Sequence, residues 1–573
     1  MFYNKKNVQR ILYLIILSFL VLTFIGIIKT IFVSSDIDEG YAVTQAYRLI
    51  KGDNFLLDMW EPHQFSAYLP AVFMKIFIKM TGSTDYIVIF LRVIGTIIHI
   101  GLGIWLYKIS ISLIGNIESL FLTLLHVNFL AKWLQIPEFE LMNYWYLLIV
   151  FLCFLSYYKI SDKNIYLIIS GICMMLQLFN YPTMIILYPF YMLGILKMRK
   201  DLKKEIVIST ISAVIPGLTF IGYLFSYMNF KIFTKSLSYV MSDPSHMDRK
   251  FSARMLDFGF SVLTDIAIAL FSFFVIFLII YLITNSKNIN INTKEIIIIT
   301  FIIDIIIYCI VMAYGCLLLN KNQFYLQSRY LIIAVLGIYL YYNFARKESA
   351  IYWFGIVPGF VAMIATLLVT NMTMNVAYSK LYICVIGCFL LLFMTIREQE
   401  KLSTFTCIIS HISCIAVLMS LILCKLVLIR VTGCLPVTMN ANLSEVEVGP
   451  LKGIYLVERT ANTVNSNFST IEKYVTEKDN LLYFGCENMI YLCTNANISA
   501  ASVQGTSVFN EDFLDYFKEH PGKYPTVVAI DKNFSTDYYM VYNPYNYIMA
   551  DWIENKFEYN EKIETDDMIL YFK

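Results

Sequence analysis

The chain has 573 residues, of which 58% are hydrophobic and only 15% are charged. A soluble globular protein carries about 25% charged residues, so this composition excludes a soluble protein and predicts one that spans a membrane. The formal net charge of +2 and the lack of a Lys/Arg-rich tract argue against nucleic acid or another polyanion as a partner.

Apolar runs near the roughly 20 residues that cross a bilayer recur along the first three quarters of the chain and stop at about Arg430. The first run follows Lys5, Lys6 and Arg10 and is too long for the core of a signal peptide, so we interpret it as a retained helix. The pattern predicts an α-helical polytopic membrane protein with about 13 transmembrane helices. The expected helices cover residues 11–33, 86–107, 112–130, 144–158, 164–178, 182–196, 206–227, 259–284, 295–318, 330–344, 350–370, 380–396 and 403–429.

Basic residues concentrate in one set of the loops between these runs. If the N-terminus is cytoplasmic, these loops lie on the cytoplasmic side, as the positive-inside rule expects. An odd number of helices then places the C-terminus outside the cytoplasm, together with the loops 34–85, 131–143, 228–258 and 319–329. The basic residues of the inner loops are Lys159, Lys163, Lys197, Arg199, Lys200, Lys203, Lys204, Arg346, Lys347, Arg397 and Lys401.

The sequence becomes polar after about residue 430, which divides the chain into a transmembrane domain, 1–430, and a soluble domain, 431–573. Strand-like and helix-like stretches alternate in the second part, so we expect a small extracytoplasmic α/β domain. The expected strands are Leu451–Val457, Asn480–Phe484, Thr526–Asp531 and Met568–Phe572, and the expected helices are Asn510–Glu519 and Tyr547–Lys556.

The first outer loop is rich in acids. Asp36, Asp38 and Glu39 lie within four residues, directly after the first helix leaves the membrane. A general base requires an acid of this kind, held in a preformed site where burial can adjust its pKa. The alternative is that these acids cap the next helix, since Asp and Glu favour the first turn of a helix.

The run Asp38–Tyr41, followed by Ala46 and Gly52–Asp53, resembles the first-loop signature of the GT-C glycosyltransferases. The resemblance is particularly to the branch that contains the protein O-mannosyltransferases and the bacterial lipid A aminoarabinose transferases. It covers roughly residues 11–345 and implies a GT-C-like transmembrane domain. It also implies that Asp38 is the catalytic residue, with Glu39 beside it.

Farther along this loop, Trp60–His63 and Tyr68–Pro70 are similar to the Pro-rich amphipathic stretch of the same family. In some members this stretch carries metal or substrate ligands, so the resemblance makes Glu61 and His63 candidates for binding a divalent metal cation. Two ligands are too few for a metal site on their own. A wet interfacial loop is therefore the alternative.

The next outer loop contains Gln135–Glu140, close to the point where the family places a second acid. The pattern departs from the family's Asp motif, because two glutamates, Glu138 and Glu140, are available instead. The resemblance implies that Glu138 positions the acceptor or holds a cation, with Glu140 close behind it. The alternative is that both acids stabilise the first turn of the following helix.

A later outer loop carries Lys321, Arg329 and Tyr330 at the mouth of a helix. These residues resemble the family's outer-loop cation that neutralises the phosphate of a polyprenyl-linked sugar donor. Arginine suits this role because its planar guanidinium stays charged and binds phosphate through two hydrogen bonds. The alternative is an interfacial arginine beside a belt tyrosine.

The resemblance and the topology lead to one hypothesis: an inverting glycosyltransferase that takes a sugar from a polyprenyl-phosphate donor on the outer side of the cell membrane. The expected partners are the lipid-linked sugar and membrane lipids, with no nucleic acid. A divalent metal cation is the one cofactor that the resemblance suggests.

Two other classes of function fit the composition. Asp265, Asp304, His99 and His126 fall within or near predicted spans, where a transporter of a lipid-linked or cell-envelope substrate would use them as a relay. Against this alternative, the two halves of the chain show no inverted repeat. The second alternative is a non-catalytic scaffold whose outer domain binds an envelope polymer.

Overall fold

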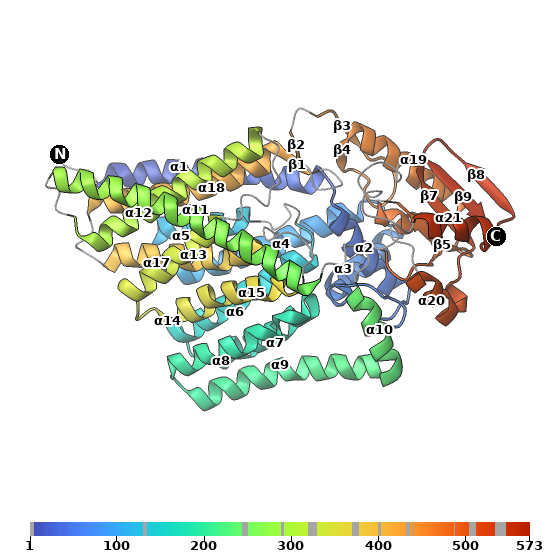
Figure 1. Cartoon of the computed structure of the whole chain (residues 1–573), viewed down its shortest axis with the longest axis horizontal. Helices are drawn as coiled ribbons and strands as arrows, with labels where there is room; N and C mark the ends of the chain where they lie inside the picture. The colour runs from blue at the N-terminus through green and yellow to red at the C-terminus, as the bar shows by residue number, and fades with distance from the viewer. Residues whose placement is uncertain are drawn as a thin grey trace.

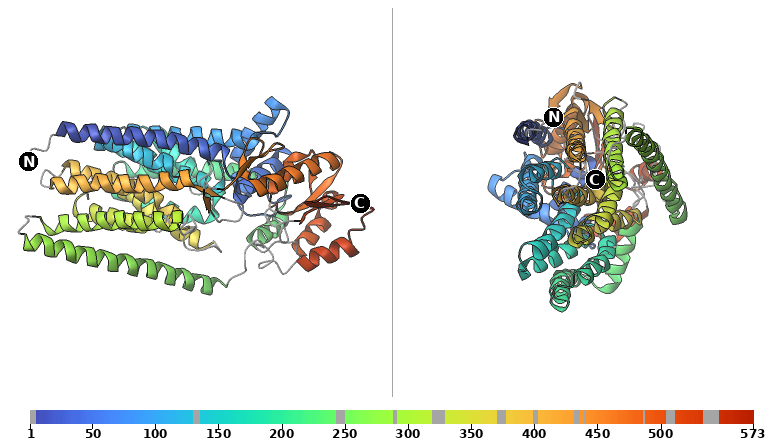
Figure 2. Two further views of the ribbon diagram at one scale, coloured as in Figure 1. Left: turned by 90° about the horizontal axis from the view of Figure 1, so that it is seen from above. Right: turned by 90° about the vertical axis from the view of Figure 1, so that its left-hand side faces the viewer.

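The computed structural model is an elongated helical bundle with a small mixed domain at one end (Figure 1). The N-terminus lies at the far end of the bundle, and the C-terminus lies in the mixed domain at the opposite end of the molecule (Figure 2). The structure describes residues 5–129, 135–242, 250–287, 291–318, 329–369, 377–398, 403–430, 436–438, 441–485, 487–503, 511–532 and 546–573.

Apolar helices form the bundle, and each predicted run overlaps one of them. Within the described ranges eight helices are long and apolar enough to cross a membrane, and three shorter helical segments are also apolar. The chain is therefore a mainly helical, multi-pass membrane protein. The number of crossings stays a prediction, because α5 and α13 have only 13 and 15 residues. The bundle consists of α1 (Lys5–Phe32), α4 (Ile87–Ile114), α5 (Asn116–Asn128), α6 (Phe139–Lys159), α7 (Asn164–Asn180), α8 (Leu187–Met198), α9 (Leu202–Phe225), α11 (Phe251–Ser286), α12 (Thr293–Leu318), α13 (Arg329–Asn343), α14 (Ser349–Ile351), α15 (Val357–Leu367), α17 (Tyr382–Glu398) and α18 (Thr404–Val427).

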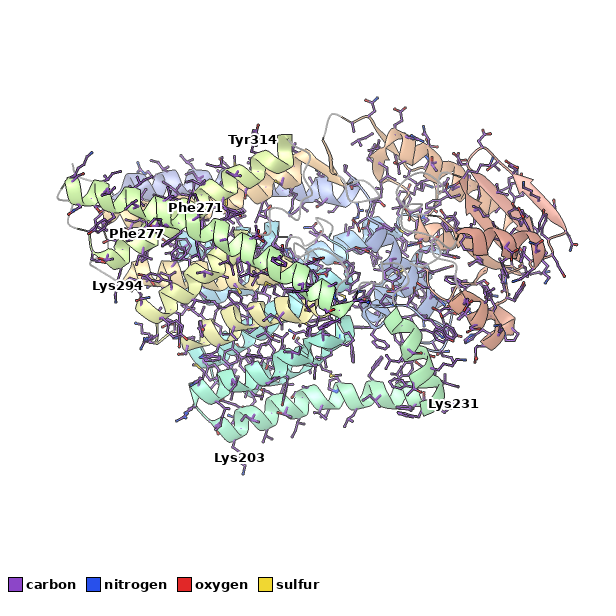
Figure 3. All side chains as sticks on the ribbon, in the orientation of Figure 1. Lys203, Lys231, Phe271, Phe277, Lys294 and Tyr314 are labelled. Atoms are coloured by element: carbon purple, nitrogen blue, oxygen red, sulfur yellow. The ribbon has the colours of Figure 1, made fainter. Side chains whose placement is uncertain are left out.

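The outside of the bundle is covered by large apolar side chains. On α11, for example, Phe271 is 72% exposed and Phe274 is 61% exposed; Figure 3 labels Phe271 on this helix. A helix can keep such side chains exposed only in a lipid environment, where its backbone polar groups remain paired within the helix. The exposed apolar surface therefore agrees with a position in the bilayer.

Three further helices lie at the end of the bundle that faces the mixed domain: α2 (Ile37–Ile50), α3 (Tyr68–Thr81) and α10 (Phe230–Ser242) (Figure 1). These segments were predicted as outer loops, and their helices were not expected because each is shorter than a membrane span. The side chain of Asp36 caps the N-terminus of α2. Shortly after the helix ends, the chain changes direction at Gly52, which adopts a positive φ of 98°.

The C-terminal domain contains a five-stranded sheet in the order β6-β5-β7-β9-β8. Strand β5 (Asn480–Phe484) pairs in parallel with β6 (Asn497–Ile498) and β7 (Val527–Asp531), whereas β9 (Met568–Phe572) is antiparallel to β7 and to β8 (Glu561–Glu564). The domain also contains three helices: α19 (Glu458–Tyr474), α20 (Glu511–Glu519) and α21 (Asn546–Asn555). The prediction of a small α/β unit is confirmed, although α19, β6 and β8 were not expected.

Two short antiparallel pairs precede the sheet: β1 (Leu428–Arg430) with β2 (Pro436–Thr438), and β3 (Leu443–Glu445) with β4 (Tyr455–Val457). The predicted strand Leu451–Val457 is therefore wrong in its first half. The chain turns there because Gly453 adopts a positive φ of 82°, which ends an extended segment.

The segment 34–86 lies between the bundle and the C-terminal domain and is hydrogen-bonded to the domain at several points. The Ser34 amide donates to Tyr455 O at 2.9 Å, and the Trp60 amide donates to Ala501 O at 2.9 Å. The hydroxyl of Thr44 on α2 donates to Asn488 O, also at 2.9 Å. These contacts fix the position of α2, which carries the predicted catalytic acid.

Candidate functional site

Tyr181 lies near acidic residues from two segments, the start of α2 and the start of α6. It directly follows α7 and is 6% exposed. Burial raises the pKa of its phenol well above the ordinary value, and the nearby charges of Glu140, Glu138 and Asp38 raise it further. Glu140, which accepts the hydrogen bond of the Tyr181 hydroxyl, is in direct contact with this ring, and the charges of Glu138 and Asp38 also reach it.

Asp38 is carried by the first turn of α2. Its backbone amide donates to Asp36 Oδ1 at 2.9 Å, so Asp36 is the residue that caps the helix. The side chain of Asp38 is only half-buried. Asp36 thus caps the helix, while Asp38 and Glu39 lie in its first turn, as the alternative expects, so the catalytic role of Asp38 stays a prediction.

Glu39 has a different environment. Its two carboxylate oxygens accept hydrogen bonds from Arg92 of α4, from Nε at 2.7 Å and from Nη2 at 2.6 Å. Both side chains are almost completely buried, with 0% and 1% exposed. Arg92 also donates to the carbonyl oxygens of Thr30, Ile31 and Ser34 near the end of α1. This geometry gives Glu39 a role in joining α1, α2 and α4 and does not support the prediction that it shares in catalysis.

Glu138 and Glu140 both lie at the start of α6. Glu138 caps the helix, since its carboxylate accepts hydrogen bonds from the amides of Glu140 and Leu141 at 2.9 and 2.7 Å. Glu140 forms a buried ion pair with Lys380 and accepts a hydrogen bond from the Tyr181 hydroxyl. Glu138 therefore stabilises the start of the helix, as the alternative proposed, while Glu140 pairs with the ammonium group of Lys380.

Lys380 is the site residue that the sequence analysis missed. It belongs to the short 3₁₀ helix η5 (Ser379–Leu381) that leads into α17, and it is 4% exposed. Its Nζ lies 4.6 Å from the centroid of the Tyr181 ring. In the sequence it begins an apolar run and is 240 residues from Glu140, so the only signal was a charged residue at the edge of a span.

His63 also borders the cluster. Its ring stacks on Phe139 with centroids 4.0 Å apart and meets the Tyr181 ring edge-on at 4.9 Å. Its Nδ1 lies 3.1 Å from Asn180 O. The backbone of His63 is in the left-handed region, with a φ of 57°. This conformation places the imidazole against Phe139 and Tyr181.

Glu61 does not join His63 in a metal site. Its carboxylate accepts hydrogen bonds from Arg48 Nη1 at 3.1 Å, from the Val503 amide at 2.9 Å and from the Ser502 hydroxyl at 3.3 Å. Among the residues that the structure describes, no three His, Cys, Asp or Glu side chains gather as a metal would require. These residues do not fit the predicted cation, so no step of the mechanism is assigned to a metal.

Arg48 of α2 lies at the centre of a buried polar network. Its Nε donates to Asp53 Oδ2 at 2.7 Å, and Nη1 donates to Glu61 and to Ala501 O. Burial alone would lower the pKa of Arg48, but the charges of Asp53 and Glu61 outweigh it and raise the pKa above its ordinary value. The second Asp53 oxygen pairs with Lys523 of the C-terminal domain. The network therefore joins α2 to that domain.

Of the predicted phosphate-binding residues, Lys321 and the side chain of Arg329 lie outside the described residues. Tyr330 is 1% exposed and packs edge-on against Phe129 and Tyr382, with centroids 6.2 and 5.3 Å away. This position is inside an aromatic cluster of the bundle. The geometry therefore does not place the Tyr330 hydroxyl in the group around Tyr181.

The membrane histidines of the transporter alternative are paired with each other. His99 Nε2 donates to His126 O and His126 Nε2 donates to His99 O, both at 2.9 Å, while the Trp145 indole donates to His99 Nδ1 at 2.9 Å. Asp265 accepts a hydrogen bond from the Tyr378 hydroxyl. These bonds satisfy the histidines inside the bundle and hold them in place.

No family model matches the sequence, and no curated protein matches it. Several solved structures align with it at low sequence identity. The oligosaccharyltransferase of Archaeoglobus fulgidus in complex with Zn and sulfate aligns with a TM-score of 0.46 and 12% identity, over 93% of this chain and 69% of that chain. The ArnT protein of Cupriavidus metallidurans bound to undecaprenyl phosphate aligns with a TM-score of 0.49 and 9% identity, over 98% of this chain and 97% of that chain.

A third structure is archaeal oligosaccharyltransferase AglB from Archaeoglobus fulgidus with an inhibitory peptide and a dolichol-phosphate. It aligns with a TM-score of 0.42 and 12% identity, over 95% of this chain and 72% of that chain.

Glu487 of the C-terminal domain packs against Gly40, in the first turn of α2 that also carries Asp38. A Cβ atom added to Gly40 would lie only 3.2 Å from Glu487 Oε1, so the two segments touch at this glycine. Burial raises the pKa of Glu487 to about 8. The hydrogen bond from the Met489 amide opposes this rise, and the charges of Glu39 and Asp36 add to it.

This raised pKa predicts a pH-dependent stability. The unfolded chain releases the Glu487 proton near the ordinary value of 4.5, whereas the folded chain keeps it up to about 8. Folding stability from this group should therefore fall as the pH rises from about 4.5 to about 8 and then level off. We expect Glu487→Gln to melt at the same temperature as wild type near pH 5 and at a higher temperature at pH 8, in detergent. The exposed Glu477→Gln is the control, and a difference that does not grow with pH would contradict the assignment.

Proposed function

We propose that the chain is an inverting glycosyltransferase that transfers a sugar from a polyprenyl-phosphate donor to an acceptor on the outer side of the membrane. The transmembrane domain, 1–430, would carry the chemistry, and the C-terminal domain, 431–573, would hold its outer loop. The donor class follows from the resemblance of Asp38–Tyr41 to the GT-C first-loop signature.

One set of observations supports this proposal: Asp38 is half-buried and its charge acts on Tyr181, whose hydroxyl donates to Glu140 of the buried Glu140–Lys380 ion pair. Glycosyl transfer from a phosphate needs a base for the acceptor and a cation for the leaving group. The cluster supplies both in one place. Burial of Lys380 strengthens its interaction with a phosphate, because little water competes for it.

The chemistry follows from these positions. The acceptor hydroxyl attacks the anomeric carbon of the sugar, and its proton passes to the Asp38 carboxylate. The bond between the anomeric carbon and the phosphate oxygen breaks, and its electron pair leaves with the polyprenyl phosphate. Lys380 stabilises that charge by exchanging part of its contact with Glu140 for the phosphate. Attack from the side opposite the phosphate inverts the anomeric centre.

This function requires a cytoplasmic N-terminus and an external C-terminus. Lys203 and Lys294, which start α9 and α12, lie at the end of the bundle away from the C-terminal domain (Figure 3). Basic residues at that end favour the cytoplasmic side. We expect an alkaline phosphatase fused after Lys573 to be active, and a green fluorescent protein fused there to be dark. An active phosphatase on the N-terminus instead would reverse the topology and remove the function proposed.

The role of Lys380 has a separate test. We expect Lys380→Met combined with Glu140→Gln to weaken the binding of undecaprenyl phosphate at least about tenfold, because a charge-assisted hydrogen bond to the phosphate is lost. The double change avoids leaving Glu140 buried without its cation. Glu140→Gln alone is the comparison variant: it frees Lys380 from its anion and should bind the lipid at least as well as wild type. Equal binding by the double variant would return Lys380 to a purely structural role.

A transporter remains the second candidate, and Asp304 of α12 favours it. This side chain is 1% exposed and lies within the bundle. An acid of this kind inside a bundle is a candidate relay. Lipid extracts from cells that carry Asp38→Asn separate the two functions: a blocked transferase accumulates a polyprenyl-phosphate sugar, whereas a transporter would require Asp304 and not Asp38.

A further inference from the structure

Two buried amides adjoin the cluster around Tyr181. Asn143 and Asn180 are both 0% exposed, and neither the Nδ2 nor the Oδ1 atom of either residue has a hydrogen-bond partner in the described part of the chain. Buried polar side chains are normally satisfied, so four unpaired atoms on two neighbouring helices need an explanation. One explanation is that these amides form their hydrogen bonds with a bound ligand.

Their positions point toward the site. Asn143 lies three residues after Glu140 and four after Phe139 on α6, and residues at these spacings share one face of a helix. Glu140 and Phe139 both contact Tyr181. Asn180 ends α7, directly before Tyr181, and its carbonyl oxygen meets the His63 ring. Asn180 therefore adjoins Tyr181 in the chain, and Asn143 lies one turn farther along the face of α6 that contacts Tyr181.

The chemistry of these groups selects a class of ligand. Each amide offers two N–H donors and one acceptor oxygen. A sugar hydroxyl both donates and accepts, so neighbouring hydroxyl groups can satisfy both atoms of an amide. Neither amide carries a charge, so the two favour a hydroxyl-bearing sugar ring as their ligand. The phosphate is left to Lys380, the cation of the neighbouring ion pair.

We infer that Asn143 and Asn180 form the sugar subsite of the donor and bind neighbouring hydroxyl groups of the transferred sugar. This inference rests on the proposed function, because the sugar must be carried to the site by a polyprenyl phosphate held near Lys380. It extends that function by assigning recognition of the sugar to two residues outside the acidic motif.

The test measures how two lipids raise the melting temperature of the purified full-length protein in detergent. The probes are undecaprenyl phosphate and undecaprenyl phosphate glucose. Wild type should bind the glucose-bearing lipid about tenfold more tightly than the bare lipid, as two or more added hydrogen bonds allow. Asn143→Leu and Asn180→Leu should each bind the bare lipid as wild type does and lose most of the preference for glucose. Asn164→Leu, at the other end of α7, is the matched control and should keep it.

The possible outcomes are distinct. Leucine is close to asparagine in size, and replacing an unpaired amide should leave the melting temperature of the unliganded protein unchanged or higher. A lower melting temperature would mean that the amides bind structural water, which overturns the subsite. If wild type binds both lipids equally tightly, the sugar subsite is also overturned, but the proposal that the donor is a polyprenyl phosphate is retained. If neither lipid binds to wild type, the proposed function fails and the subsite fails with it.

Discussion

Asp38→Asn should abolish sugar transfer while expression, membrane insertion and donor binding stay nearly intact. Asparagine keeps the shape and hydrogen-bonding reach of aspartate, but it cannot accept a proton at neutral pH. The loss should therefore appear in the chemical step, as a decrease in kcat of about a hundred- to ten-thousand-fold. The measurement is turnover in proteoliposomes that contain a polyprenyl-phosphate sugar, with donor binding measured separately.

Asp36→Asn is the matched control two residues earlier. Asp36 caps α2, and asparagine caps a helix about as well as aspartate, so this variant should keep most of its turnover. If Asp38→Asn retains normal kcat while Asp36→Asn loses it, the base is Asp36 and the resemblance is out of register. Normal transfer by both variants would leave the site without a base and would favour the transporter.

The sequence predicted those parts of the fold that depend on local pattern. Strands β5 and β9 were predicted to the residue, because each is a short apolar run between polar turns. Helix α19 was missed, since its many Asn, Ser and Thr residues are weak helix formers. Tertiary packing stabilises it through Ala461, Val464, Phe468 and Ile471, whose spacing of three and four residues was the available signal.

The site was predictable where a motif is local and not where partners are distant in the chain. Asp38 was proposed from its own loop and stays a prediction, but the sequence could not show that its neighbour Glu39 pairs with Arg92, 53 residues away. The pairing of Lys380 with Glu140 spans 240 residues. Adjacent acids on one helical turn point in different directions, and only the fold decides which of them is enclosed by a partner.

The Glu39–Arg92 pair should be a major determinant of stability. Arg92→Met would leave Glu39 buried without its cation and would free the carbonyl oxygens of Thr30, Ile31 and Ser34, which Arg92 now binds. Removing one partner of a buried ion pair costs about 3–5 kcal/mol, so we expect a marked loss of folded protein and a lower melting temperature in detergent. The exposed Arg459→Met is the control and should behave as wild type.

A double-variant cycle separates this structural role from catalysis. Glu39→Met combined with Arg92→Met replaces the pair with apolar side chains, an exchange that is often neutral in other proteins. We expect the double variant to recover much of the melting temperature lost by either single variant, because no buried charge is then left unpaired. Sugar transfer per folded molecule should recover with it, since Asp38 supplies the base. If the double variant folds normally but its kcat stays as low as that of Asp38→Asn, Glu39 takes a direct part in the reaction and the structural assignment is wrong.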